Sequence, residues 1–116
     1  AAIVIAGRNG GKNAAAVASL GEAGAKVSAY VVDVADETQC HAMVAHAVDK
    51  FGRLDILVNN AATNPYFGPL VDIDDLRMQK TYEINQASIL YHVRAAWHQP
   101  ATPHSRSDAR CGRDRG

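Results

Sequence analysis

Short apolar runs rich in β-branched residues alternate along this chain with segments of helical length. Strands are predicted at residues 3–6, 27–34 and 54–58, and helices at 12–23, 36–51 and from 72 or 74 to 98. The connections between successive strands are far too long for hairpins, so the strands are expected to pair in parallel through right-handed crossovers. The pattern predicts an α/β fold, a partial doubly wound parallel sheet of three strands with three helices.

Residues with special backbone preferences mark the ends of the predicted helices. Asp36 and Gln39 form a capping box, in which each side chain binds a free backbone N–H at the start of the helix. Gly24 and Gly52 are predicted helix stops, and Pro100 ends the last helix. The helix after Asp36 has one apolar stripe, made of Cys40, Met43, Val44, Ala47, Val48 and Phe51. The last helix, capped by Asp72 or Asp74, places five large side chains on one side: Tyr82, Ile89, Leu90, Val93 and Trp97.

The balance of charges argues against partners that bind through long-range electrostatic attraction. Twelve basic and twelve acidic residues give the 116-residue chain a formal net charge of zero, so neither nucleic acid nor an anionic membrane is an expected partner. No apolar run approaches the roughly eighteen residues of a membrane span. Cys40 and Cys111 lie far apart without a CxxC pairing, which disfavours a disulfide scaffold and a zinc module. A cytoplasmic location is therefore expected.

The two ends of the chain differ from its middle. The first residues are already strand-like and have no initiating Met, so a segment upstream is expected to be missing. Residues 99–116 contain four arginines but no Leu, Ile, Val, Met or aromatic residue, so they cannot bury a face and are predicted to form a polar, disordered tail. Residues 1–98 are predicted to form one partial domain, and the chain is expected to be interrupted or frame-shifted near Gln99.

Ligands of open parallel sheets bind beyond the carboxyl ends of the strands. The residues that follow each predicted strand are therefore candidates for ligand binding. A glycine there lets a ligand come close to the backbone. An arginine there can pair bidentately with a phosphate, although arginine is also an ordinary surface residue at the end of a strand. An aspartate can accept a hydrogen bond from an exocyclic amine or simply open a helix. Asparagines can bind loop backbone or form a turn. The residues at these positions are Gly7, Arg8, Asp33, Val34, Asn59 and Asn60.

No pattern in the sequence predicts a metal site. His41 and His46 are five residues apart, a spacing that does not stack them on one face of a helix, and no HExxH motif occurs. The later histidines offer no better geometry and are expected to be solvated; they are His92, His98 and His104.

Three segments carry a family resemblance. Residues 33–37 read DVADE, residues 51–61 read FGRLDILVNNA and residues 83–85 read EIN. Together they resemble the short-chain dehydrogenase/reductase family, particularly its 3-oxoacyl carrier-protein reductase-like and carbonyl reductase-like members. The resemblance covers residues 1–98 and implies a partial Rossmann-like, NAD(P)-binding domain. It also implies hydride transfer between a nicotinamide and a carbonyl or alcohol carbon of a small-molecule substrate.

The resemblance assigns roles to the residues after the second and third predicted strands. In such enzymes an Asp-Val pair, here Asp33 and Val34, holds the adenine. An Asn-Asn-Ala-Gly motif lines the adenosine ribose and steadies the sheet, and it corresponds to Asn59, Asn60 and Ala61, with alanine in place of the last glycine.

Two further assignments concern cofactor preference and the proton relay. Members that use NADP bind its 2′-phosphate with an arginine after the preceding strand, so Gly7 followed by Arg8 implies NADP, with NAD less favoured. Asn85 corresponds to the family's helix asparagine, which helps to hold a proton-relay water near the catalytic lysine. We expect Arg8, Asp33 and Asn60 to lie together along one nucleotide-facing rim.

The family's catalytic residues are not found. No lysine stands four residues after any tyrosine, so a Tyr-x-x-x-Lys pair is absent, and no strand with the catalytic serine follows the last helix. Without them there is no general acid for the developing alkoxide. The chain is therefore expected to be an inactive fragment of an oxidoreductase. The alternative is a non-catalytic nucleotide-binding or scaffold module, and in either case the 72–98 helix could join copies into a homo-oligomer.

Overall fold

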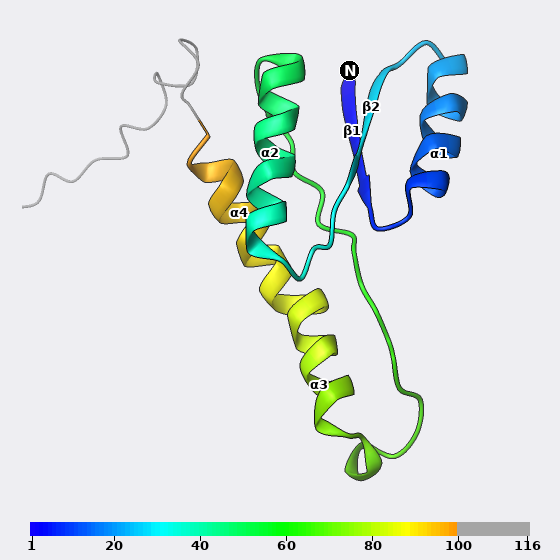
Figure 1. Ribbon diagram of the computed structural model, residues 1–116, viewed down its shortest axis with the longest axis vertical. Coiled ribbons are helices and arrows are strands. Elements are labelled where there is room, and N and C mark those ends of the chain that lie inside the picture. Colours follow the sequence, from blue (N-terminus) through cyan, green and yellow to red (C-terminus); the bar gives the residue numbers. More distant parts are fainter. Residues whose placement is uncertain (100–116) are drawn as a thin grey trace, which may run out of the picture.

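Two parallel strands and a set of helices make up the structure. The computed structural model describes residues 1–99, so the predicted 99–116 tail lies outside the described residues except for Gln99. The elements in chain order are β1 (Ala2–Gly7), α1 (Gly10–Glu22), β2 (Lys26–Val31), α2 (Glu37–Phe51), a 3₁₀ helix (Leu70–Asp72), α3 (Asp75–Tyr82), a π-helix (Glu83–Ala87) and α4 (Ser88–Trp97). Figure 1 shows α1 on one side of the strand pair and α2 with α4 on the other.

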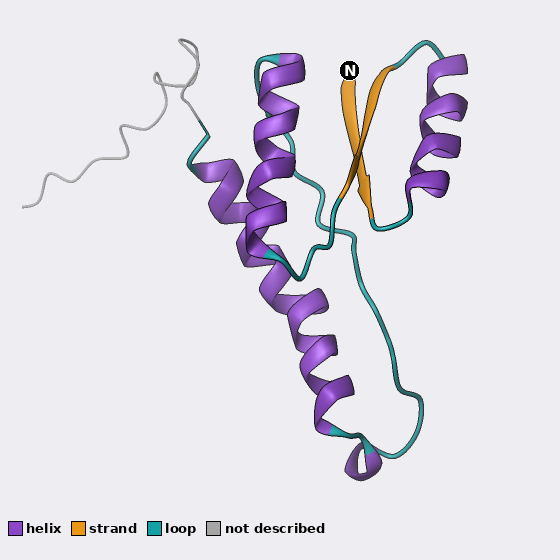
Figure 2. Cartoon of the chain, in the orientation of Figure 1, coloured by secondary structure: helices purple, strands orange, loops and turns teal. Residues whose placement is uncertain are grey.

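The strands pair as the crossover argument predicts. β1 and β2 run parallel, with Ala2 opposite Lys26 and Gly7 opposite Val31, and α1 connects them. The backbone N–H of Val32 adds a hydrogen bond of 3.2 Å to the carbonyl oxygen of Gly7. The predicted α/β, Rossmann-like fold class is confirmed (Figure 2).

Local signals place the ends of α2 correctly. Asp36 caps the helix by accepting a hydrogen bond of 3.1 Å from the N–H of Gln39, and Gly52 ends it with a φ of 83°. The second half of the predicted capping box differs. The side-chain oxygen of Gln39 accepts from the N–H of Asp33 at 2.9 Å, and its nitrogen donates to the Asp36 carboxylate at 3.1 Å. The turn after β2 brings the N–H of Asp33 within reach, so Gln39 binds it instead of the cap backbone.

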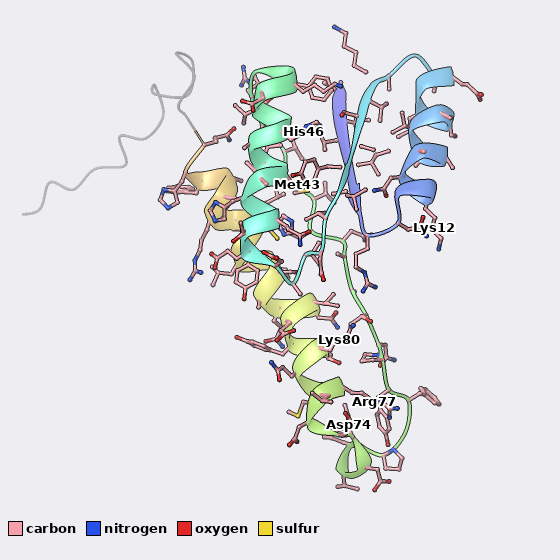
Figure 3. The ribbon with its side chains drawn as sticks, viewed as in Figure 1. Lys12, Met43, His46, Asp74, Arg77 and Lys80 are labelled. Atoms are coloured by element: carbon pink, nitrogen blue, oxygen red, sulfur yellow. The ribbon has the colours of Figure 1, made fainter. Side chains whose placement is uncertain are left out.

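The core lies between β2, α2 and α4. Val32 is fully buried, and it packs with Met43, Val44 and Ala95. Figure 3 shows Met43 on the side of α2 that faces the strands. The predicted stripe of α2 is the face that packs, because four of its members are buried: Cys40, Met43, Val44 and Ala47.

The predicted last helix is divided by a π-helix, and its buried face is not the face with the large side chains. Asp74 caps α3, accepting a hydrogen bond of 2.9 Å from the N–H of Arg77. One large apolar residue and three small or polar residues pack inward from the later turns: Ile84, then Ser88, His92 and Ala95. The five large side chains expected on one side are 43–82% exposed. The expectation that His92 is solvated is wrong, because its Nδ1–H donates to the carbonyl oxygen of Ser88 at 2.8 Å inside the helix pair.

The predicted third strand, residues 54–58, is not formed. The described residues contain a two-stranded sheet, and residues 54–58 run beside β1 without pairing to it. Ile56 and Val58 are 78% and 77% exposed. The apolar sequence suits a buried strand, but residues 54–58 pair with no strand in the described part of the chain, so their backbone has no ladder to join.

Candidate functional site

A small polar cavity lies at the carboxyl ends of the two strands. It has a volume of about 250 Å³ and is lined by Arg8 after β1, by Asp33 after β2, and by residues of α3 and the π-helix that include Lys80 and Glu83. Figure 3 shows Lys80 on α3. The structure therefore brings Arg8 and Asp33 to one cavity, and it adds a cation and an acid that sequence reasoning did not select. In the sequence, Lys80 and Glu83 are marked only by their charge on a helix that is predicted to be exposed.

The register of the sheet explains why Arg8 and Asp33 meet. Gly7 and Val31 are opposite each other at the ends of β1 and β2, so the residues that follow leave the sheet at the same edge. The Asp33 carboxylate accepts a hydrogen bond of 3.0 Å from the N–H of Ala35, which fixes the turn. Arg8 is exposed and takes part in none of the ion pairs formed among residues 1–99. Its guanidinium is free to bind an anion.

Asn13 joins the strand ends from α1, and sequence reasoning missed it. Its side-chain nitrogen donates to the carbonyl oxygens of Gly7 at 3.0 Å and Tyr30 at 3.3 Å, and the residue is buried. A Cβ on Gly7 would lie 2.8 Å from the Asn13 side-chain oxygen. A side chain at position 7 would therefore displace the hydrogen-bonded Asn13, so glycine here suits the packing of α1 against the strand. An asparagine inside a predicted helix, where its propensity is poor, was the available signal.

The asparagine motif lines a second, larger cavity. Its volume is about 550 Å³, and it lies between β1, α2, α4 and residues 53–61, which include Asn59, Asn60 and Ala61. Val34 also lines this cavity, whereas Arg8 and Asp33 line only the smaller one. The expected rim is therefore divided, with Arg8 and Asp33 in one cavity and Asn60 in the other.

Asn85 holds the loop that follows the asparagine motif. Its side-chain oxygen accepts from the N–H of Thr63 at 2.8 Å, and its side-chain nitrogen donates to the Thr63 carbonyl at 2.9 Å. Asn85 lies in the π-helix, a feature often found at functional sites. Gln99, which sequence reasoning did not select, makes the same pair of bonds to Leu54, at 3.0 and 2.8 Å. Two side-chain amides thus hold the two ends of residues 54–63.

Cys40 lies below the turn that carries Asp33 and Val34. Its thiol is fully buried and donates to the carbonyl oxygen of Val34 at 3.4 Å. Burial raises the pKa of Cys40 to about 11, and the carboxylates of Asp36, Asp33 and Glu37 add to the shift. The thiol is therefore protonated at neutral pH and does not serve as a nucleophile.

Residues 1–99 contain no group of three or more His, Cys, Asp or Glu side chains that could hold a metal ion. The Nε2 atom of His41 lies 3.8 Å from a carboxylate oxygen of Glu37, one turn away on α2. Between residues 1 and 99, no helix is both long and apolar enough to cross a membrane.

Comparisons with known proteins agree with the geometry. The family model described as short chain dehydrogenase matches residues 1–105. Tropinone reductase-like 3 of Erythroxylum coca is 35% identical over 99 residues, which are 84% of this chain and 38% of that protein. Dehydrogenase/reductase SDR family member 4 of Homo sapiens is 41% identical over 70 residues, 60% of this chain and 25% of that protein.

Solved structures give the same result. A double mutant of a short-chain dehydrogenase/reductase from Serratia marcescens superposes with a TM-score of 0.76 at 32% identity, covering 83% of this chain and 39% of that one. A short chain dehydrogenase from Mycobacterium smegmatis gives a TM-score of 0.78 at 30% identity, covering 82% and 39%. The chain thus spans well under half the length of these relatives. With its parallel βαβ unit, the Asp33-Val34 turn and the Asn59-Asn60-Ala61 loop, the chain belongs to the short-chain dehydrogenase/reductase family.

Proposed function

We propose that this chain carries the adenosine-binding part of an NADP-preferring oxidoreductase, one that transfers hydride between the nicotinamide and a carbonyl or alcohol carbon of a small molecule. The observation that carries the proposal is that Arg8 and Asp33 line one polar cavity at the carboxyl ends of the strands. When bound, the cofactor supplies or accepts the hydride. The chain's own residues bind and orient its adenosine half.

The cation in the cavity favours a phosphorylated ribose. Arg8 follows Gly7 directly, and no acid stands there to accept a hydrogen bond from a 2′-hydroxyl. A guanidinium can pair bidentately with a 2′-phosphate, and Lys80 adds a second positive charge, partly offset by Glu83. Asp33, held in its turn by the N–H of Ala35, can accept a hydrogen bond from the adenine amino group. NADP therefore fits this cavity better than NAD.

The asparagine residues are proposed to shape the site and not to react. Asn59, Asn60 and Ala61 would border the ribose, as they do in the family. Both polar atoms of the Asn85 side chain bind the backbone of Thr63. Asn85 is thus a positioning residue for this loop, and the predicted proton-relay role stays a prediction. Because the sequence has no Tyr-x-x-x-Lys pair, we expect no carbonyl reduction by this chain alone.

The proposal is tested by titrating the full chain with NADP⁺ and NAD⁺ in a calorimeter. NADP⁺ is expected to bind about ten- to a hundredfold more tightly, the amount given by charge-assisted hydrogen bonds to one phosphate. Arg8→Gln should remove this preference. Lys12→Gln is the matched control, because Lys12 is a nearby exposed cation on α1 that does not line the cavity. Equal binding of both nucleotides, or an unchanged preference in Arg8→Gln, would contradict the proposal.

A second candidate function is that of a non-catalytic interaction module that forms homo-oligomers through residues 72–98. The exposed apolar side chains of α3 and α4 favour it, since Leu76 is 79% exposed and Trp97 is 82% exposed. Sedimentation should then show association that increases with concentration and is reduced by Leu76→Glu. Carbonyl reduction by the purified chain would exclude the non-catalytic function, and it would also contradict the expectation that the chain alone is inactive. A cytoplasmic location belongs to both proposals, in keeping with the free thiol of Cys40.

A further inference from the structure

The last position of β1 is kept free of a side chain by a residue of α1. Figure 1 shows the first turns of α1 beside the end of β1. The side-chain oxygen of Asn13 lies so close to Gly7 that a Cβ built there would be 2.8 Å away from it. At that separation one of the two atoms has to move. Whether position 7 can carry a side chain therefore depends on whether Asn13 can yield.

The amide of Asn13 is fixed in its orientation. Its nitrogen donates to the carbonyl oxygens of Gly7 at 3.0 Å and Tyr30 at 3.3 Å. Turning the amide over would place its oxygen against these two acceptors, so the observed orientation is the one that forms hydrogen bonds. Because only 6% of Asn13 is exposed, moving the side chain away would leave a buried amide without its acceptors. The oxygen beside Gly7 is thus held in place.

Position 7 is also where an acid would change the choice of cofactor. Gly7 ends β1, and the next residue, Arg8, lines the polar cavity. In dinucleotide-binding folds an Asp or Glu accepts a hydrogen bond from the 2′-hydroxyl of the ribose, whereas an arginine accommodates a 2′-phosphate. A carboxylate at position 7 would stand beside Arg8, where it would repel a phosphate and compete for the guanidinium. Glycine leaves Arg8 without such a competitor.

We propose that Asn13 is a specificity-determining residue that acts through Gly7. By filling the space beside the Gly7 Cα, it excludes an acidic side chain there and reserves the cavity for a phosphorylated ribose. An acid would be excluded twice over, because its Cβ would clash with the Asn13 oxygen and its carboxylate would be repelled by that oxygen. Asn13 does not line the cavity, so it is a positioning residue. The inference rests on the proposed function, because it concerns the same cavity.

The hydrogen bonds of Asn13 also give it a structural role, which makes different predictions. If Asn13 only joined the ends of β1 and β2, its removal would lower stability and weaken the binding of both nucleotides alike. A role in specificity adds a conditional effect. An acid introduced at position 7 should then reach the ribose only when the Asn13 side chain is absent.

The test titrates NAD⁺ and NADP⁺ into the full chain in a calorimeter, with Gly7→Asp made alone and together with Asn13→Ala. Gly7→Asp alone should change the NAD⁺ affinity by less than about threefold, because Asn13 displaces the carboxylate. Adding Asn13→Ala should then raise the NAD⁺ affinity about tenfold, as expected for charge-assisted hydrogen bonds to the ribose. Asn13→Ala alone should shift the affinities for both nucleotides by the same factor, because glycine remains at position 7.

Asn9→Asp is the matched control, since it places an acid on the other side of Arg8. Asn9 caps α1, and Asp is an equally good capping residue. The Asn9 side chain binds the N–H of Lys12 and does not contact the Asn13 amide in any hydrogen bond of residues 1–99. Adding Asn13→Ala to Asn9→Asp should therefore leave the NAD⁺ affinity within about twofold. If a melting curve shows that an Asn13→Ala variant does not fold, Asn13→Ser replaces it, because the shorter serine keeps one donor.

The outcomes separate this inference from the proposed function. An NAD⁺ affinity of Gly7→Asp that does not depend on Asn13 would overturn the inference, as would an equal gain in the Asn9→Asp pair. Equal binding of NADP⁺ and NAD⁺ by the unaltered chain would instead contradict the proposed function, and the comparison of Gly7→Asp with and without Asn13 does not depend on that result. Absence of nucleotide binding in every variant would overturn both.

Discussion

The strand pair β1–β2 and the segment of residues 54–63 have similar apolar sequences but different structures. β1 and β2 share a six-residue parallel register, and the buried side chain of Asn13 joins their carboxyl ends. Residues 54–63 are held at each end by a side-chain amide, and the backbone between those ends forms no hydrogen bond with the described residues. An apolar run therefore becomes a strand only where a neighbouring strand completes its ladder.

The two regions also differ in how deeply their apolar side chains are buried. Val32, next to β2, is fully buried under α2 and α4, whereas Ile56 and Val58 are mostly exposed. The polar cavity with Arg8 and Asp33 lies at the end of the paired region, and the larger apolar cavity separates the paired region from the unpaired one. Mutations should therefore have large effects in the first region and small effects in the second.

The largest effect is expected in the packed region. Met43→Ala should lower the free energy of unfolding by about 2–5 kcal/mol, because Met43 is 8% exposed and its loss leaves a cavity beside Val32. Met78→Ala is the matched control at 59% exposure and should change it by less than about 0.5 kcal/mol. Urea denaturation followed by circular dichroism measures both. Similar losses in the two variants would show that α2 does not organise the core.

Burial of the Cys40 thiol gives a pH-dependent test of the same region. The pKa of Cys40 rises from 9.0 to about 11 on folding, so the unfolded chain loses the thiol proton first. The contribution of the buried thiol to the free energy of unfolding should therefore be complete below pH 9. It should be lost as the pH rises from 9 to 11. In a Cys111→Ser background, the folded chain at pH 8 should react with iodoacetamide roughly a hundredfold more slowly than the unfolded chain. Equal rates would mean that the packed region is open to solvent.

A double-mutant cycle at the strand ends should show a smaller, coupled effect. Asn13→Ala leaves two carbonyl oxygens without a partner, and Gly7→Ala places a Cβ 2.8 Å from the Asn13 oxygen. Each change should cost about 1–3 kcal/mol of unfolding free energy. The double variant should lose less than the sum, because the clash disappears with the Asn13 side chain. Additive losses would show that the contact does not constrain Gly7.

The smallest effect is expected for the amide that holds the unpaired segment. Asn85→Ala removes two hydrogen bonds to Thr63 and should cost about 1 kcal/mol, mostly as local opening. Limited proteolysis should cut residues 55–63 faster in this variant. Gln86→Ala is the control, since Gln86 is exposed and contacts no loop residue in the hydrogen bonds of residues 1–99. A cleavage rate unchanged by Asn85→Ala would mean that another contact holds the loop.

Features set by neighbouring residues could be predicted from the sequence. Asp36 and Gly52 mark the ends of α2 as predicted, and Asp74, one of the two residues predicted to cap the last helix, caps α3; each acts through bonds within one turn. The parallel order of β1 and β2 follows from the length of the crossover between them. These predictions succeed because the interactions are local or topological.

Features that depend on distant partners could not be predicted. The apolar pattern of residues 54–58 indicates a segment that could form a buried strand. It does not indicate whether a neighbouring strand is present to pair with it. Gln99 reaches Leu54 across 45 positions, and His92 is buried because α4 packs on α2 with its small residues. The division of the candidate site between two cavities has the same origin, since it depends on how α3 and the π-helix approach Arg8 and Asp33.

Hydrogen exchange of the free chain, measured residue by residue, tests the central comparison most directly. We expect strong protection of the paired amides of β2 and Val32, and exchange of the amides of residues 55–62 at rates near those of an unstructured peptide. Protection of residues 55–62 equal to that of β2 would show that this segment is already part of a ladder, and would contradict the account.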